Sequence, residues 1–107
     1  MKVRYLIAMT AALSVSATAF AADDGEALFK KSSCVSCHTL DKKSVGPALK
    51  DISAKYAGDK TAQAKLETKV RNGGSGSFGS MPMPPTAKSV SDENIKSMVA
   101  WVLSLKK

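Results

Sequence analysis

Hydrophobic residues recur every three or four positions near the C-terminus, the spacing that places them on one face of a helix. Ser91 is a suitable N-cap for this helix, and Asp92 and Glu93 carry negative charge in its first turn. Lys106 and Lys107 suit its C-terminal end. The apolar face of the expected helix consists of Ile95, Met98, Val99, Trp101, Val102, Leu103 and Leu105.

Three shorter segments also have helical character. The stretch 23–32 begins with acidic and ends with basic residues, an order that suits the dipole of a short helix. Pro47 can open a second helix over 48–56, and Gly73 follows a third over 60–72. No segment has the alternating pattern of a strand, and no internal repeat is present. The sequence therefore predicts an all-α fold.

The stretch GGSGSFGSMPMPP at 73–85 interrupts the helical pattern, because it is rich first in glycine and then in proline. This composition excludes a regular helix or a central strand, and it is often that of a flexible linker. Phe78, Met81 and Met83 are apolar, however, and the prolines stiffen the chain. We therefore expect an ordered loop that packs against another part of the protein.

Residues 1–21 have the pattern of a secretory signal peptide. Lys2 and Arg4 form a basic start, an apolar stretch follows, and small residues surround the expected cleavage position. A membrane anchor is the alternative, but the apolar run is short for a span, and serine and threonine dilute it. We expect cleavage after Ala21, export to the periplasm, and a mature domain of residues 22–107 without stable membrane insertion.

The mature domain is small and basic. Cleavage removes two of the 16 basic residues and none of the 9 acidic ones, so the net charge falls from +7 to +5 and 86 residues remain. A chain of this size has difficulty burying enough apolar surface to offset its conformational entropy, so such domains usually carry a disulfide, a metal or a cofactor. A disulfide between the two cysteines would close too small a loop to stabilise much.

The stretch CVSCHTL at 34–40 holds both cysteines and the single histidine of the chain. Cys-x-x-Cys-His is the attachment signature of c-type haem. Two thiols at this spacing can add to the two vinyl groups on one edge of the porphyrin, and the imidazole of the next residue then lies within reach of the iron. A covalently bound haem would supply the large apolar body that so small a chain lacks.

Three alternatives compete with haem attachment. A thioredoxin-like redox pair requires a β-α-β setting, which the pattern lacks. Zinc bound by Cys34, Cys37 and His38 would lack a fourth nitrogen or sulfur ligand. A chance match to so short a motif is the third alternative, and the export signal disfavours it because bacteria attach c-type haem outside the cytoplasm.

A methionine sulfur is the best candidate for the second axial ligand of the iron, because the chain has no second histidine. Met98 lies on the apolar face of the C-terminal helix, which favours a place in the core. Met81 and Met83 point to the same side of an extended loop, so geometry alone leaves both open. Met83 is slightly favoured, because prolines flank it on both sides.

Together these features resemble those of a short bacterial class I cytochrome c of the c-551/c-552 group. The resemblance runs through the whole mature region and rests on four segments. In order they are ALFKKSSCVSCH, KSVGPALKDISAKYAG, GSMPMPP and SDENIKSMVAWVLSLK. It implies a small helical fold wrapped round one haem, in which the first and last helices cross. Leu28 and Phe29 should then pack near Trp101 and Val102.

The resemblance also implies a role for each haem-binding residue. Cys34 and Cys37 match the two thioether attachments, and His38 matches the proximal iron ligand. Pro47 matches the proline whose carbonyl accepts the proton of the other histidine nitrogen, a contact that orients the imidazole. Met83 matches the distal ligand of the iron.

Two positions depart from the family pattern. Phe78 stands where relatives often have a tryptophan that donates its N–H toward a haem propionate, and phenylalanine cannot donate. Thr86 stands where relatives often have an asparagine that donates to the methionine sulfur, so the threonine hydroxyl is the group available for that contact. The segment 86–90 is also slightly longer than in some relatives.

These features predict an electron carrier and not an enzyme, because iron held by both His38 and Met83 has no open position for a substrate. We expect single electrons to pass between respiratory proteins that bind transiently, such as a cytochrome bc-type donor and a terminal reductase, peroxidase or oxidase as acceptor. The alternatives are a haem enzyme or gas sensor with a free sixth position, and a bound haem subunit of a larger reductase or oxidase.

Lysines give the expected domain a basic surface. Lys30, Lys31, Lys42 and Lys43 either keep the protein in solution or steer it toward acidic partners. Nucleic acid is not an expected partner of an exported protein, and nothing in the sequence requires more than a monomer.

Overall fold

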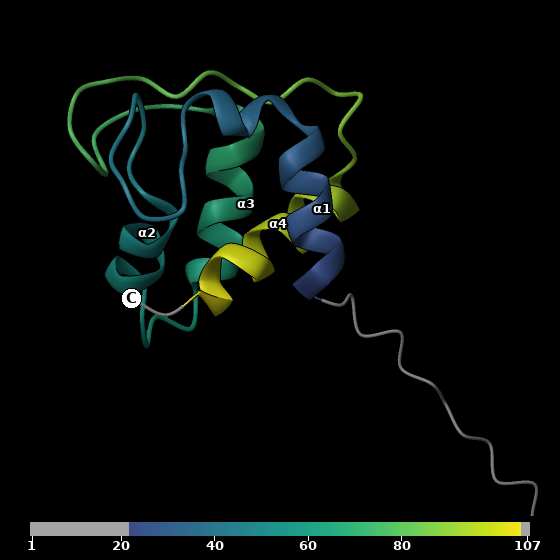
Figure 1. The fold of residues 1–107 in the computed structure, drawn as a ribbon, viewed down its shortest axis with the longest axis horizontal. Helices are drawn as coiled ribbons and strands as arrows, with labels where there is room; N and C mark the ends of the chain where they lie inside the picture. Colours follow the sequence, from purple (N-terminus) through teal and green to yellow (C-terminus); the bar gives the residue numbers. More distant parts are fainter. Residues whose placement is uncertain (1–21, 106–107) are drawn as a thin grey trace, which may run out of the picture.

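The computed structural model describes residues 22–105, which form helices joined by loops (Figure 1). The predicted signal peptide lies outside the described residues. Between 22 and 105, the only β-type pairing is an isolated antiparallel bridge between Gly74 and Met83, so the predicted all-α class is confirmed. The elements are α1 (Ala22–Lys31), the 3₁₀ helix η1 (Ser33–Ser36), α2 (Leu49–Lys55), α3 (Ala62–Asn72) and α4 (Asp92–Ser104).

Helix α4 is the centre of the fold, because α1, α2 and α3 all pack against it. Its N-terminus forms as predicted, since the Ser91 hydroxyl accepts a hydrogen bond from the Asn94 backbone N–H at 3.1 Å. Its C-terminal end at Ser104 comes earlier than predicted, because Leu105 adopts an extended backbone. None of the helices in the described part of the chain is long and apolar enough to cross a membrane.

Helices α1 and α4 cross, as the resemblance implied (Figure 1). The rings of Phe29 and Trp101 lie with their centroids 5.3 Å apart and are tilted by 50°, a favourable arrangement for two aromatic rings. Gly25 permits this approach, because a Cβ there would overlap the Ser97 carbonyl oxygen and lie 2.7 Å from Trp101 Cβ. The buried hydrophobic cluster consists of Phe29, Leu49, Ile95, Met98, Val99, Trp101 and Val102.

The glycine- and proline-rich segment 73–85 is a loop that packs on the helices, as expected, and Figure 1 shows it reaching well beyond the end of α3 before it returns. Within it, the Gly76 N–H donates to the Gly79 carbonyl at 2.8 Å. Lys55 of α2 donates a hydrogen bond to the Ser77 carbonyl. The loop thereby covers one side of a cavity whose other walls are the helices and the 37–47 segment.

Candidate haem site

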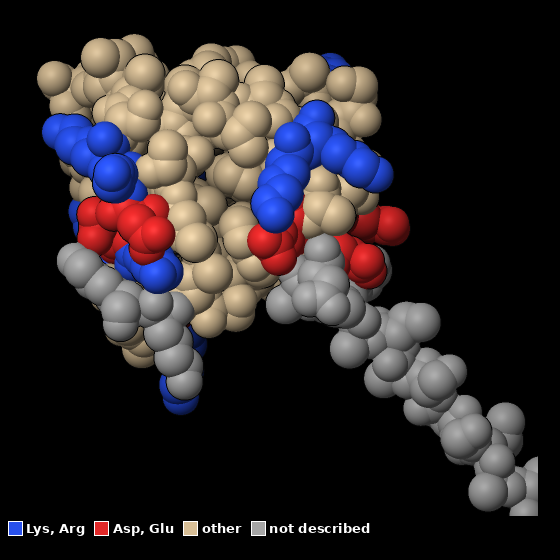
Figure 2. Space-filling model, in the orientation of Figure 1, with Lys and Arg blue, Asp and Glu red and all other residues tan. Residues whose placement is uncertain are grey.

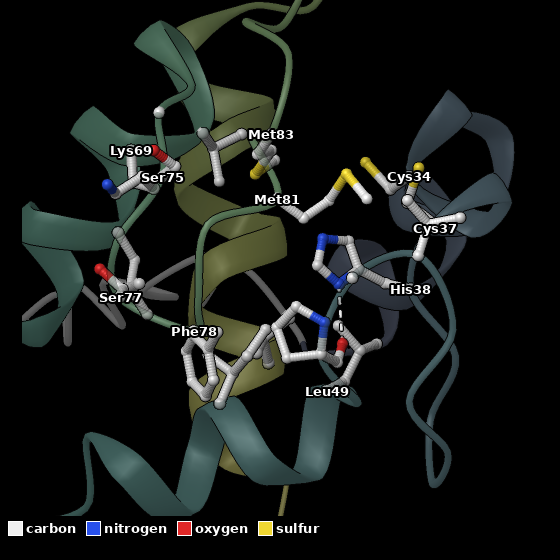
Figure 3. A pocket seen from close by; sticks show the side chains of 18 of the residues that line it. Cys34, Cys37, His38, Leu49, Lys69, Ser75, Ser77, Phe78, Met81 and Met83 are labelled. Atoms are coloured by element: carbon white, nitrogen blue, oxygen red, sulfur yellow. Dashed lines mark hydrogen bonds between the residues drawn. The ribbon is translucent and has the colours of Figure 1, made fainter.

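A cavity of about 540 Å³ lies between the 73–85 loop and the helices (Figure 3). Its wall is mostly apolar, and side chains from every helix contribute to it. The volume falls within the range of cofactor and ligand pockets, roughly 300–1,000 Å³. The structure brings together at this cavity all five residues that the sequence assigned to haem, namely Cys34, Cys37, His38, Pro47 and Met83.

The two cysteines are placed by η1, a short helical turn that the sequence pattern did not indicate. The backbone N–H groups of Cys37 and His38 both donate to the Cys34 carbonyl oxygen, at 3.1 and 2.9 Å. This tight turn brings both sulfur atoms to one wall of the cavity (Figure 3). Both thiols are free and partly buried. Burial raises the pKa of the Cys34 thiol above its ordinary value, so it is a neutral thiol near pH 7.

The imidazole of His38 is held by a backbone carbonyl. Its Nδ1 atom lies 2.8 Å from the Pro47 carbonyl oxygen. A carbonyl can only accept a hydrogen bond, so Nδ1 carries a proton, and in the neutral ring the lone pair is then on Nε2. In Figure 3 the nitrogen that does not contact Pro47 faces the cavity on the side of Met81 and Met83. In its neutral form, the form of histidine that binds metals, the ring therefore directs this lone pair to the cavity.

Gly46 contacts the same ring, and the sequence analysis did not identify it. A Cβ at this position would lie 2.6 Å from His38 Cε1 and 2.9 Å from Nδ1, closer than real Cβ atoms approach other atoms. The Gly46 N–H also donates to the Cys37 carbonyl at 2.7 Å. The signal in the sequence was a glycine directly before Pro47, because a glycine without Cβ lets its backbone come close to another group.

Met81 and Met83 both line the cavity, but the chain holds them differently. Met83 is partly buried, and its backbone exchanges two hydrogen bonds with that of Gly74, at 2.8 and 3.0 Å. Gly73 permits this pairing, since its φ is +71° and a Cβ there would overlap the Met83 carbonyl oxygen. Met81, in contrast, is 64% exposed. Of the two methionines, Met83 has the more closely fixed position.

The third methionine belongs to the core, as its place on the apolar helix face predicted. Met98 is 4% exposed and is part of the buried cluster around α4. The Ser32 hydroxyl, which donates to the Leu28 carbonyl at 2.8 Å, lies 3.9 Å from its sulfur atom.

The expected contact between Thr86 and a methionine sulfur is wrong. The Thr86 hydroxyl donates to the Val70 carbonyl oxygen of α3 at 2.7 Å. The Thr86 backbone N–H donates to the same oxygen at 3.2 Å. A hydroxyl has a single proton, so Thr86 cannot also donate to sulfur. This residue instead fastens the chain after Met83 to α3.

Phe78 lies at the edge of the cavity and has a different role from the tryptophan it replaces. It is partly exposed, and the Lys55 ammonium lies 4.5 Å from the centre of its ring, a cation–π distance. Together with the hydrogen bond from Lys55 to the Ser77 carbonyl, this contact attaches the glycine-rich part of the loop to α2.

The cavity suits a covalently attached, largely apolar cofactor. It combines two thiols, an imidazole lone pair and a fixed thioether within a mostly apolar wall (Figure 3). A zinc site is not formed, because between residues 22 and 105 no three histidine, cysteine, aspartate or glutamate side chains cluster so that they could hold a metal ion. The residues present therefore fit haem and do not fit the zinc alternative.

Comparison with known proteins agrees with this geometry. A family model described as Cytochrome c matches residues 22–106. The chain is 44% identical over 106 residues to cytochrome c-551 of Pseudomonas aeruginosa, an alignment that covers 99% of this chain and 100% of that protein. It is 48% identical over 79 residues to cytochrome c-552 of Nitrosomonas europaea, over 74% of this chain and 76% of that protein.

The fold is similar to that of solved cytochromes. The crystal structure of wild-type Nitrosomonas europaea cytochrome c552 matches with a TM-score of 0.72 and 47% identity, over 76% of this chain and 99% of that chain. Proteins of this family contain haem c, with its iron, bound covalently. The chain therefore belongs to the cytochrome c family, and it is a small monohaem electron carrier and not an enzyme.

Proposed function

We propose that this chain is a periplasmic electron carrier whose iron is held between His38 and Met83. The observation that carries the proposal is that Met83, the more closely fixed of the two loop methionines, lines the same cavity as the free nitrogen of His38. Haem supplies the one-electron couple of iron when it is bound. The chain supplies two ligands, an apolar wall and two thiols for attachment.

Each of the site residues has a separate task in this proposal. Cys34 and Cys37 form the two thioether bonds, which fix one edge of the cofactor to η1. Pro47 keeps the His38 ring in one orientation through the 2.8 Å hydrogen bond, a contact that also raises the basicity of the ligand. Met83 closes the sixth position to water and substrates, and His/Met ligation raises the potential of the iron.

We also propose that residues 1–21 are a signal peptide, removed after Ala21 during export. The mature domain would then be residues 22–107, with 86 residues. The mass of the protein isolated from the periplasm checks this directly. A mature protein that retains residues 1–21 would contradict the proposed processing.

Partner proteins are expected to bind briefly, as redox partners of electron carriers do. Val35, Val45 and Met81 are exposed near the cysteines and the cavity, and they would offer a small apolar contact surface. We propose a cytochrome bc-type donor, a terminal reductase, peroxidase or oxidase as acceptor, and a monomer as the working form. Nucleic acid is not a proposed partner.

The basic residues do not form one continuous positive face in the view of Figure 2. There they gather in two groups, each beside acidic side chains. Lys30 pairs with Glu26 at 3.0 Å, and Lys50 pairs with Asp41 at 2.7 Å. Pairing of this kind favours a solvated surface over strong electrostatic steering for the lysines concerned.

Replacing each loop methionine in turn tests the ligation. We expect Met83→Leu to remove the weak far-red band of ferric sulfur-to-iron charge transfer, to lower the reduction potential, and to let carbon monoxide bind the reduced protein. Met81→Leu is the matched control, and we expect it to keep the band and to exclude carbon monoxide. If Met81→Leu loses the band while Met83→Leu keeps it, the assignment of the distal ligand is wrong.

A further inference from the structure

Arg71, in the last turn of α3, reaches across to the segment that connects the Met83 loop to α4. Its guanidinium donates to the backbone carbonyls of Thr86 at 3.4 Å, Ala87 at 3.2 Å and Val90 at 2.6 Å. It also makes two hydrogen bonds, at 3.1 and 2.7 Å, to one carboxylate oxygen of Asp92. One side chain thus fixes three points of a connection that has no regular structure of its own, and also the first residue of α4.

The neighbouring residues of α3 hold the same loop. The Val70 carbonyl accepts both the hydroxyl and the backbone N–H of Thr86. The Met83 backbone itself pairs with Gly74 through two hydrogen bonds. Met83 therefore lies between two attachments, and both of them are made to the C-terminal end of α3 or to the residues that directly follow it.

The chain between these attachments is stiff. Pro84 and Pro85 follow Met83 directly, and proline rings fix the φ angle of the backbone. A shift of the connection at Thr86 would therefore reach Met83 through only two residues, both with a fixed φ angle. Whatever holds the connection also fixes the position of the thioether.

We propose that Arg71 is a positioning residue that holds the Met83 thioether at the iron by clamping the 86–91 connection and the start of α4 to α3. The proposal rests on the proposed function, because it assumes that Met83 is the distal ligand. A planar guanidinium can donate to several acceptors in fixed directions at once, whereas a lysine ammonium is a compact point charge. The Arg71 side chain is 24% exposed, so water competes only partly for these contacts.

The proposal predicts a weaker iron–methionine bond when Arg71 is replaced. In the haem-loaded Arg71→Gln variant we expect the far-red band to be lost at a pH about one unit lower than in the wild type. We expect the affinity of the ferric protein for added imidazole to rise about tenfold. In both measurements Arg71→Lys should fall between the wild type and Arg71→Gln, because lysine keeps the charge but not the fork of donors.

The matched control is Lys65→Gln on the same helix. Lys65 also pairs with an aspartate, Asp59 at 3.1 Å, but this pair lies at the other end of α3, away from the loop. We expect imidazole affinity and the far-red band to remain as in the wild type. Urea unfolding followed by far-UV circular dichroism is measured on all three variants, so that a general loss of stability can be separated from a local release of Met83.

The possible results decide between a positioning and a merely structural role. If Arg71→Gln unfolds more easily but keeps wild-type imidazole affinity and the wild-type pH midpoint of the band, the proposal is overturned. If Arg71→Gln does not accumulate with haem, the Arg71→Lys variant decides. Wild-type imidazole affinity and a wild-type pH midpoint of the band in Arg71→Lys would then overturn the proposal. A wild-type protein without the far-red band would instead contradict the proposed function itself.

Discussion

His38 is the residue on which the site depends most, and two neighbours determine how its ring lies. The Pro47 carbonyl accepts the Nδ1 proton, and Gly46 packs directly against the ring edge. Because the Gly46 N–H also binds the Cys37 carbonyl, the ring, the attachment turn and the 46–47 backbone form one close-packed unit. A side chain at position 46 would have to displace the ligand or the backbone that carries it.

We therefore expect Gly46→Ala to disturb the ligand. Forcing an extra methyl group into a packed site typically costs about 1–3 kcal/mol of unfolding free energy, which urea denaturation measures. In this variant the proton on His38 Nδ1 should also exchange faster with solvent, because the added methyl group would strain its hydrogen bond to Pro47.

Gly58→Ala provides the comparison for this variant. Gly58 has φ of +80°, so alanine there is strained, but no atom lies within 4 Å of the added Cβ. We expect some loss of stability and no change in the exchange of the His38 proton. Equal exchange rates in the two variants would show that position 46 does not act on the ring.

The site residues were predictable to the extent that the chain places them in a short motif. Cys34, Cys37 and His38 lie within five positions, so their spacing alone indicates their chemistry. Gly46 and Thr86 could not be assigned in this way, because what they contact depends on tertiary packing. The hydroxyl of Thr86 had an acceptor on α3 that no pattern in the sequence reveals.

At the scale of elements, the crossing of α1 and α4 brings together residues that line the cavity. Phe29 on α1 lines the cavity and also packs against the tilted ring of Trp101 on α4. Gly25, one turn earlier, lets the two backbones approach so closely that a Cβ would overlap the Ser97 carbonyl oxygen. The residue with the poorest intrinsic helix propensity after proline is therefore the one that the crossing requires.

The close contact of Gly25 with α4 should reverse the usual effect on stability of a glycine-to-alanine change in a helix. On propensity alone Gly25→Ala would stabilise α1 by about 1 kcal/mol. We expect it to destabilise the protein instead, because α1 must move away from α4. Ala27→Gly, at an exposed position of the same helix, should lose about 1 kcal/mol through propensity only. Thermal unfolding of both variants measures the sign, and a stabilised Gly25→Ala protein would show that the helices do not meet as described.

Helix existence was more predictable than helix ends. All four α-helices were expected, α4 from apolar spacing, α1 from the order of its charges, and α2 and α3 with the flanking Pro47 and Gly73 as signals. Helix α3 ends at Asn72 with Gly73 as its cap, as predicted. Helix α4 stops before the lysines that suggested a later end. The Ser53 hydroxyl of α2 contacts the carbonyls of both Leu103 and Leu105 there. The observed end of the helix thus coincides with a contact between distant parts of the chain, which the local charge pattern does not reveal.

At the scale of the whole molecule, core and cavity share their residues. Phe29, Leu49, Met98, Val99 and Val102 belong to the buried cluster and also line the cavity. These side chains therefore have apolar surface at the cavity that only a group bound there would cover. A chain of this size has difficulty burying enough apolar surface on its own. The cofactor is therefore a structural part of the fold.

We accordingly expect the chain to be largely unfolded without haem. In a Cys34→Ala, Cys37→Ala variant isolated without haem, far-UV circular dichroism should show little helix. Urea should produce no cooperative transition. The haem-loaded wild type is the reference, and a cooperative, native-like transition in the haem-free variant would refute the dependence of the fold on the cofactor.

The most direct test of the account is the absorption spectrum of the mature wild-type protein, recorded in the ferric and reduced forms, followed by addition of carbon monoxide to the reduced form. The account predicts a low-spin ferric spectrum with the weak far-red sulfur-to-iron band and no response to carbon monoxide, because Met83 occupies the sixth position. A high-spin ferric spectrum, or prompt binding of carbon monoxide, would mean that this position is open and that His/Met ligation is wrong.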